Sequence, residues 1–145
     1  MIFVYLAASV LFMAFAEYSI HRWWQHEYSY DHYYRHHSLS DNDLELIDLP
    51  WWRALAIATP IAFAMNFYTI SLVTCFYLVV FMHAILWTLL HRAFHGISFG
   101  GIINRMPGFG ALYRPHIGHH ERPDRNYGAV FGPLVDIVFR TRREI

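Results

Sequence analysis

Two long apolar stretches dominate the hydrophobic pattern of this chain. Residues 2–20 carry a single charged side chain, Glu17, and as a helix they could span the roughly 30 Å hydrocarbon core of a bilayer. Residues 51–90 form a second stretch, which as one straight helix would be about 60 Å long. A tight turn at the polar break 66–71 would divide it into two spans, with Pro60 kinking the first. The pattern therefore predicts about three transmembrane helices.

Three crossings would bring both histidine-rich segments to one side of the membrane. The first span delivers residues 21–37 to one face, and the hairpin returns residues 91–120 to the same face. Every Arg also falls on this face, which the positive-inside rule makes cytoplasmic. We expect an all-α, multi-pass integral membrane protein with a histidine-rich helical cap on the cytoplasmic face, in a bacterial inner membrane or the endoplasmic reticulum. The 145 residues suit one domain, 1–145.

Each apolar stretch has an alternative interpretation. Ala14-Phe15-Ala16 resembles the cleavage site of a signal peptide, but there is no positive segment before the apolar run, and Arg22 follows closely, as in a retained anchor. The second stretch could be the core of a soluble protein, although helices in such a core are rarely so continuously apolar.

The composition agrees with a lipid environment. The chain is 56% hydrophobic and 15% charged, against about 45–50% and about 25% in a typical soluble domain. Its formal net charge is zero, which argues against a nucleic-acid partner. Cys75 is the only cysteine, so the sequence offers no disulfide framework and no thiolate metal site.

Eleven histidines are the most unusual feature, and ten of them fall in four boxes. Neutral imidazole is a good ligand for iron, zinc or copper. Side chains three or four residues apart share one face of an α-helix, so most members of a box would point together; the five-residue spacing of the first box is looser. Because one metal rarely takes more than six ligands, ten converging imidazoles predict two metal ions. The predicted ligands are His21 and His26; His32, His36 and His37; His91 and His95; and His116, His119 and His120.

The eleventh histidine, His83, lies inside the last apolar span. An ionisable group in the membrane is a functional candidate by default, and the sequence does not settle its role. We favour a hydrogen-bonded core histidine.

These boxes resemble the fatty acid hydroxylase superfamily, which includes sterol desaturases, membrane fatty-acid hydroxylases and carotenoid hydroxylases. The order HX4H, HX3HH, HX3H and HX2HH fits that family. The resemblance extends to the segments around the boxes, and the tail departs from the family at Arg140, where a glycine is usual. The further matching residues are Glu17-Tyr18, Asn126-Tyr127-Gly128, Asp136 and Phe139.

The resemblance implies a di-iron oxygenase that uses O2 to hydroxylate a C–H bond of a lipid, either a fatty acyl chain or a carotenoid. Electrons would come from a separate carrier, such as a ferredoxin or cytochrome b5 with its reductase. A desaturase with the same boxes and a non-catalytic membrane protein stapled by metal are the alternatives. Zinc could also occupy the site in a purified sample, because imidazole accepts both metals.

Metal-bound imidazoles usually donate their second N–H to a carboxylate or a carbonyl. The chain offers several acidic residues near the boxes, and Asn126 is a further candidate because the family motif includes it. The principal candidates for this supporting role are Glu17, Asp124, Asp136 and Asn126, with Glu27, Asp31 and Glu121 as weaker ones. Each of the acids could equally be a solvated surface charge or the partner of an Arg.

Overall fold

The computed structural model describes residues 1–29, 31–37, 59–60, 72–96 and 100–143. Every regular element in these ranges is helical, which confirms the all-α prediction. The predicted helix before residue 66 and the predicted turn at 66–71 lie almost entirely outside them.

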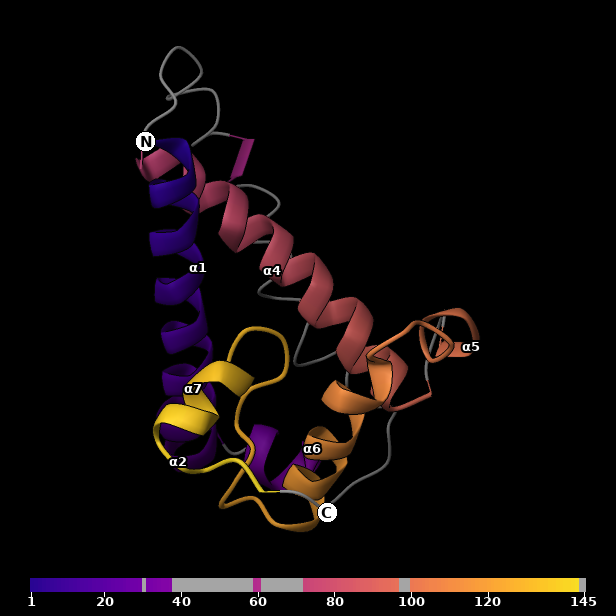
Figure 1. Cartoon of the computed structure of the whole chain (residues 1–145). Helices are drawn as coiled ribbons and strands as arrows, with labels where there is room; N and C mark the ends of the chain where they lie inside the picture. Colours follow the sequence, from indigo (N-terminus) through magenta and orange to yellow (C-terminus); the bar gives the residue numbers. More distant parts are fainter. Residues whose placement is uncertain (30, 38–58, 61–71, 97–99, 144–145) are drawn as a thin grey trace.

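The N-terminal helix is one continuous rod built from three segments (Figure 1). Helix α1 (Ile2–Ser19) is followed by a π-helical segment, η1 (Ile20–Gln25), and by a last short α-helical segment, α2 (His26–Tyr28). Large apolar side chains of α1 stay exposed, among them Phe3, Leu11 and Phe12. A helix that is apolar on all sides is typical of a membrane span.

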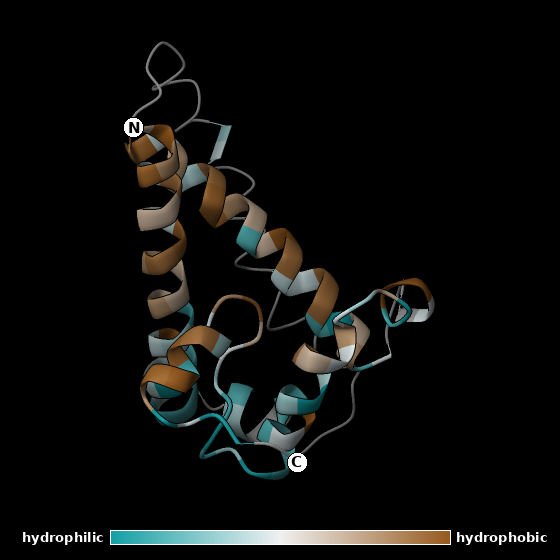
Figure 2. Ribbon diagram, viewed as in Figure 1, coloured by the Kyte–Doolittle hydropathy of each residue, from teal (hydrophilic) through white to brown (hydrophobic). Residues whose placement is uncertain are grey.

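The second long helix is α4 (Leu72–Phe94), which also exposes apolar side chains, including Leu78 and Met82. By length and composition, α4 and the N-terminal rod from Ile2 to Tyr28 are each long and apolar enough to cross a membrane. Both helices are hydrophobic over most of their length, and hydrophilic residues gather at one end of the molecule (Figure 2).

Helices α1 and α4 run in the same chain direction, and the distance between them grows toward the hydrophilic end (Figure 1). Near the start of α4, the rings of Phe12 and Phe76 meet edge to face with centroids 5.4 Å apart. Further along both helices, Glu17 contacts His83. Later residues of α1 thus meet later residues of α4, so both helices lead into histidine boxes at the same end.

The remaining helices surround that end. Segment η2 (Asp31–His36) is π-helical, and α5 (Gly100–Ile103), α6 (Phe109–Glu121) and α7 (Pro133–Val138) follow α4. Turns at residues 104–108 separate α5 from α6, and Gly108, in the left-handed region with φ 85°, is the N-cap of the helix that begins at Phe109. Pro115 therefore lies inside α6.

Candidate metal centre

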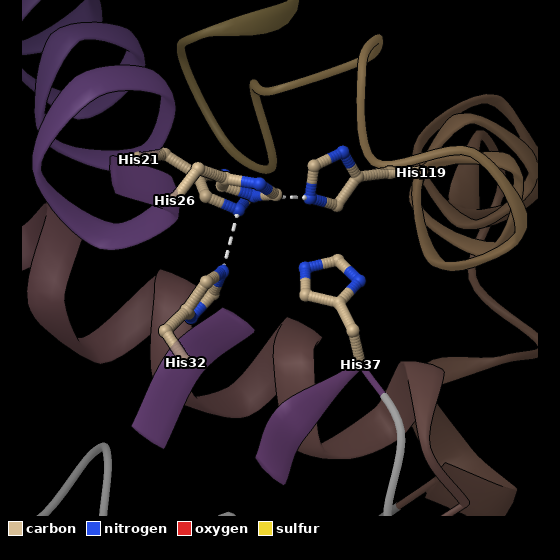
Figure 3. Close-up of side chains that lie close together, drawn as sticks. All are labelled: His21, His26, His32, His37 and His119. Atoms are coloured by element: carbon tan, nitrogen blue, oxygen red, sulfur yellow. Dashed lines mark hydrogen bonds between the residues drawn. The ribbon is translucent and has the colours of Figure 1, made fainter. Parts of the chain in front are cut away.

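The ten histidines of the four boxes gather into two groups of five. Within each group, one nitrogen from every imidazole lies within 4.8 Å of the corresponding nitrogens of the others. Figure 3 shows the first group, whose five rings approach from separate parts of the chain around a common centre. Site 1 comprises His21, His26, His32, His37 and His119, and site 2 comprises His36, His91, His95, His116 and His120.

Two π-helical segments explain the ligand spacing of site 1. His21 lies in η1 and His26 directly follows that segment, five residues later; His32 lies in η2 and His37 directly follows it, again five residues later. A π-helix closes its hydrogen bonds over five residues instead of four, so residues i and i+5 come together on one side. The five-residue spacing that is loose on an α-helix therefore suits the local backbone, and both pairs serve one site.

Site 2 is built mainly from ordinary α-helical pairs. His91 and His95 are four residues apart at the end of α4, and His116 and His120 are four apart on α6. Residues i and i+4 share a helix face, as the sequence predicted. The prediction that His32 and His36 act together is not matched by the structure, because the π-helical turn places His36 in site 2 and His32 in site 1.

Each pair of consecutive histidines is divided between the two sites. His36 belongs to site 2 and His37 to site 1, while His119 belongs to site 1 and His120 to site 2. The sites are also direct neighbours, since the rings of His37 and His120 lie 4.7 Å apart, centroid to centroid. The two neighbouring sites could each hold a metal ion, with five imidazoles available to each.

Four pairs of imidazole nitrogens, two in each site, lie at nearly the same distance. In site 1, Nε2 of His21 lies 3.0 Å from Nε2 of His32, and Nε2 of His26 lies 3.1 Å from that of His119. In site 2, the His36–His91 and His95–His116 pairs are each separated by 3.1 Å. With metal–nitrogen bonds of about 2.1 Å, ligands at right angles are about 3.0 Å apart, whereas tetrahedral ligands are about 3.4 Å apart. The observed spacing fits right-angled coordination.

The surroundings keep six of these imidazoles neutral. Burial lowers the pKa of His37 to about 4 and that of His120 to about 3, with the neighbouring histidines adding to the shift. The same causes, burial first and then the adjacent imidazoles, hold four further histidine pKa values well below the usual range. These are His32, His36, His116 and His119. A neutral ring presents the nitrogen lone pair that a metal requires.

Several converging nitrogens lack a hydrogen-bond partner. Both ring nitrogens of His37 and Nε2 of His120 are buried without one. A buried polar atom without a partner is costly, and buried exceptions in a native fold call for an unplaced water or ion. Five lone-pair donors around a centre, some otherwise unsatisfied, are the donor set of a metal site, so the residues present fit two metal ions.

Two ligands of site 1 are oriented by main-chain carbonyls of the segment after the last box. Nδ1 of His21 donates to the carbonyl of Tyr127 at 2.5 Å, and Nδ1 of His119 donates to that of Arg125 at 2.6 Å. A ring that donates from Nδ1 leaves Nε2 unprotonated and facing the site. Such outer contacts fix both the ring angle and the tautomer of a metal ligand.

The four predicted supporting residues take different places. Glu17 forms hydrogen bonds with His83 and with the main chain at 129–131, and Asp136 accepts hydrogen bonds from the main chain at 127–128. Both carboxylates therefore hold the segment that follows the last histidine box. Asn126 anchors the same segment, because its side chain pairs with both main-chain groups of Arg143. Asp124 lies at the surface beside Arg125, whose guanidinium lowers the pKa of that carboxyl.

The weaker candidates do not form part of this network in the described region. Glu27 and Glu121 are exposed, and the side chain of Asp31 lies outside what the structure describes. His83 is a hydrogen-bonded core histidine, as we favoured, with Nε2 2.7 Å from Oε2 of Glu17.

Sequence reasoning missed the carbonyls of Arg125 and Tyr127, because every residue has a main-chain carbonyl and the residue type does not show which one accepts a hydrogen bond.

The comparison with protein families agrees with this geometry. The sequence model of the fatty acid hydroxylase family matches residues 6–141, which include both π-helical segments and all ten clustered histidines. The chain belongs to the fatty acid hydroxylase family. Neither the curated proteins nor the solved structures gave a significant match. Family membership confirms the resemblance seen in the boxes, and it supports an oxidoreductase of the lipid hydroxylase or desaturase type, associated with a membrane.

Proposed function

We propose that this fatty acid hydroxylase family member is a membrane di-iron oxygenase that hydroxylates a C–H bond of a lipid, a fatty acyl chain or a carotenoid. The observation that supports this most directly is the pair of adjacent five-imidazole sites, linked through two pairs of consecutive histidines. O2 is the co-substrate, and electrons come from an external carrier such as a ferredoxin or cytochrome b5 with its reductase.

The geometry favours iron over zinc. Structural zinc is almost always four-coordinate and tetrahedral, whereas each site here offers five nitrogens. The 3.0–3.1 Å spacing between nitrogens fits ligands at right angles, as in five- or six-coordinate iron with a position left for an exogenous molecule. Zinc acquired during purification would still be held by the same imidazoles.

The ions, when bound, supply the activation of O2 that no side chain can perform. The protein's own contribution is to hold the imidazoles deprotonated, fix their orientation and restrict water. Burial restricts water, since His91 is 1% exposed and His119 is fully buried, and it also lowers the pKa of His119, which keeps that ring neutral. Hydrogen bonds from His21 and His119 to main-chain carbonyls fix the orientation of these two rings.

A membrane position gives an apolar substrate direct access from the bilayer. Exposed apolar side chains on α1 and α4 suit contact with lipid chains. Because α1 and α4 run in the same direction, both would enter a membrane from one side and leave it on the other, which supports the proposed three crossings. The arginines around the histidine end support a cytoplasmic face for the metal centre.

The test is to express the chain with iron and a reducing system under labelled O2 and to analyse total lipids and carotenoids by mass spectrometry. We expect a species that carries one labelled oxygen atom and disappears in His119→Ala, while Gly110→Ala, whose added methyl group meets open space, retains it. A new double bond without oxygen would identify a desaturase. Full metal occupancy without any product would identify a non-catalytic metal protein.

A further inference from the structure

The carboxylate of Glu17, near the end of α1, is enclosed by a loop from the far end of the chain. Its Oε1 accepts hydrogen bonds from the main-chain N–H groups of Ala129 and Val130. Its Oε2 accepts from the N–H of Phe131 at 2.9 Å and from His83 at 2.7 Å. Glu17 is only 5% exposed, so both carboxylate oxygens accept their hydrogen bonds from groups inside the protein.

Two glycines allow the loop to close this tightly. A Cβ at Gly128 would overlap the backbone of Gly132 and Pro133, and a Cβ at Gly132 would lie 2.9 Å from Oε1 of Glu17. The loop therefore crosses itself at a distance that only glycine permits.

A second carboxylate holds the other side of the same loop. Asp136 accepts from the N–H of Tyr127 at 3.0 Å and from that of Gly128 at 2.7 Å, and it also binds the hydroxyl of Thr141. We call residues 125–136, with the Glu17 carboxylate that they enclose, the C-terminal clasp.

The clasp forms hydrogen bonds with candidate metal ligands of one site only. Its carbonyls at Tyr127 and Arg125 accept from His21 and His119, and both of these histidines belong to site 1. The helical pairs of site 2 lie on α4 and α6, which hold them at regular i, i+4 spacing. Site 1 instead combines two π-helical pairs with a single residue of α6.

We propose that Glu17 is a positioning residue that acts through the C-terminal clasp on metal site 1, so that the two sites depend on it unequally. The proposal rests on the two-metal assignment made above. Glutamine at position 17 would turn an NH2 group toward main-chain N–H donors, which would open the loop and release the carbonyls from His21 and His119. Loss of such an outer contact typically weakens metal affinity 10–100-fold.

The first experiment measures iron bound per chain in buffered ferrous iron, together with the Mössbauer spectrum. The wild type should bind two irons, whereas Glu17→Gln and Gly128→Ala should each retain one and lose the signal of one iron environment. Matched controls are Asp124→Asn, which removes an exposed carboxylate from the neighbouring segment, and Gly110→Ala, whose methyl group meets open space. Both controls should bind two. Retention of two irons, or equal loss of both, in a folded clasp variant would overturn the proposal.

The second experiment uses an intact clasp and does not depend on those variants folding. Because coupling between two sites is reciprocal, metal in site 1 must stabilise the clasp that orients it. Hydrogen exchange of the amides at 129–131 should slow on metal loading in the wild type and in His91→Ala, and it should be insensitive to metal in His32→Ala. Unchanged exchange in the metal-loaded wild type would overturn the proposal. A wild type that binds fewer than two irons would instead refute the two-metal assignment itself.

Discussion

Arg140 shows how a single backbone conformation shapes the end of this chain. It follows α7 in the left-handed region, with φ 56°. The N–H of Thr141 bonds the carbonyl of Asp136 at 2.9 Å, and the N–H of Arg140 bonds that of Ile137 at 3.2 Å. These two bonds form a Schellman motif, in which the left-handed position is usually glycine. The family's usual glycine at this position is thereby explained, and so is the strain of an arginine there.

Replacing Arg140 by glycine should therefore stabilise the protein. Relief of the left-handed strain is worth roughly 1–2 kcal/mol, and the greater freedom of glycine in the unfolded chain offsets about 0.4–1 kcal/mol of that. We expect the free energy of unfolding in detergent to rise by about 0.5 to 1 kcal/mol. Arg142→Gly is the control: it lies two residues on, outside the left-handed positions, and should not stabilise. A lower unfolding midpoint for Arg140→Gly would contradict this account.

Consecutive histidines should have separable effects. His36 and His37 are covalent neighbours, yet they belong to site 2 and site 1 respectively. We expect His37→Ala to deplete the same iron environment as His32→Ala, and His36→Ala to deplete the other, as His91→Ala does. Mössbauer spectra of the four variants would check the pairing. Identical spectra for His36→Ala and His37→Ala would show that the two histidines serve one ion.

At the scale of elements, the local helical period decides which histidines belong to the same site. The 3.6-residue repeat correctly predicts the pairs His91–His95 and His116–His120, because α4 and α6 are regular there. It fails for His32 and His36, since η2 is π-helical. The five-residue spacing was visible in both early boxes, but nothing in residue type distinguishes a π-helical segment from a loose α-helical end.

The contribution of the C-terminal segment was only partly predictable. Glu17, Asp136 and Asn126 could be singled out, as polar residues near the boxes with family counterparts. Their partners are main-chain groups brought together by the tight loop at Gly128, and main-chain groups are common to all residues. The sequence could therefore indicate which side chains matter and could not show what they hold.

A one-residue deletion in η1 tests the role of the π-helical period. Removing Trp24, whose side chain is 61% exposed, would place His21 and His26 four residues apart and allow an α-helical register. His26 would then rotate relative to the rest of site 1, and we expect one iron per chain to be lost while helix content measured by circular dichroism is kept. Trp24→Ala, which removes the side chain without changing the register, should keep both irons. Full occupancy after the deletion would mean that the period is unimportant.

At the scale of the whole molecule, burial sets the protonation state of the metal centre. Histidine with an ordinary pKa near 6.5 is about half protonated at pH 6.5. Six of the ligands, for which the pKa lies below this value, are neutral at that pH in the metal-free protein: His32, His36, His37, His116, His119 and His120. The centre is therefore prepared for metal before any ion arrives.

Metal uptake at pH 6.5 should consequently release few protons from these six histidines, instead of the roughly half proton per ligand expected of exposed imidazoles. Because these pKa values are lowered, protons compete with metal for the imidazole nitrogens only well below neutral pH. Bound metal should therefore be lost as the pH falls toward about 4, the pKa of His37. Anaerobic pH-indicator titration with ferrous iron measures the first quantity, and metal analysis after dialysis at each pH measures the second. Release near half a proton per histidine would contradict the lowered values.

The predicted orientation is a further property of the whole molecule. With Cys75→Ser as background, Phe3→Cys and Glu121→Cys place single thiols at exposed positions, the first near the start of α1 and the second at the end of α6. A membrane-impermeant reagent added to inverted inner-membrane vesicles should label Glu121→Cys and spare Phe3→Cys. The reverse pattern would place the metal centre on the outer face.

The division of each consecutive histidine pair between the two ions has a geometric consequence. Successive Cα atoms are 3.8 Å apart whatever the helices around them do. One peptide link in η2 and another in α6 therefore tie the ions together twice, from different sides of the centre. We expect the distance between two bound ions to vary little when the bilayer thickens, thins or warms, because adjacent residues and their packed side chains set it, and not the positions of separate helices.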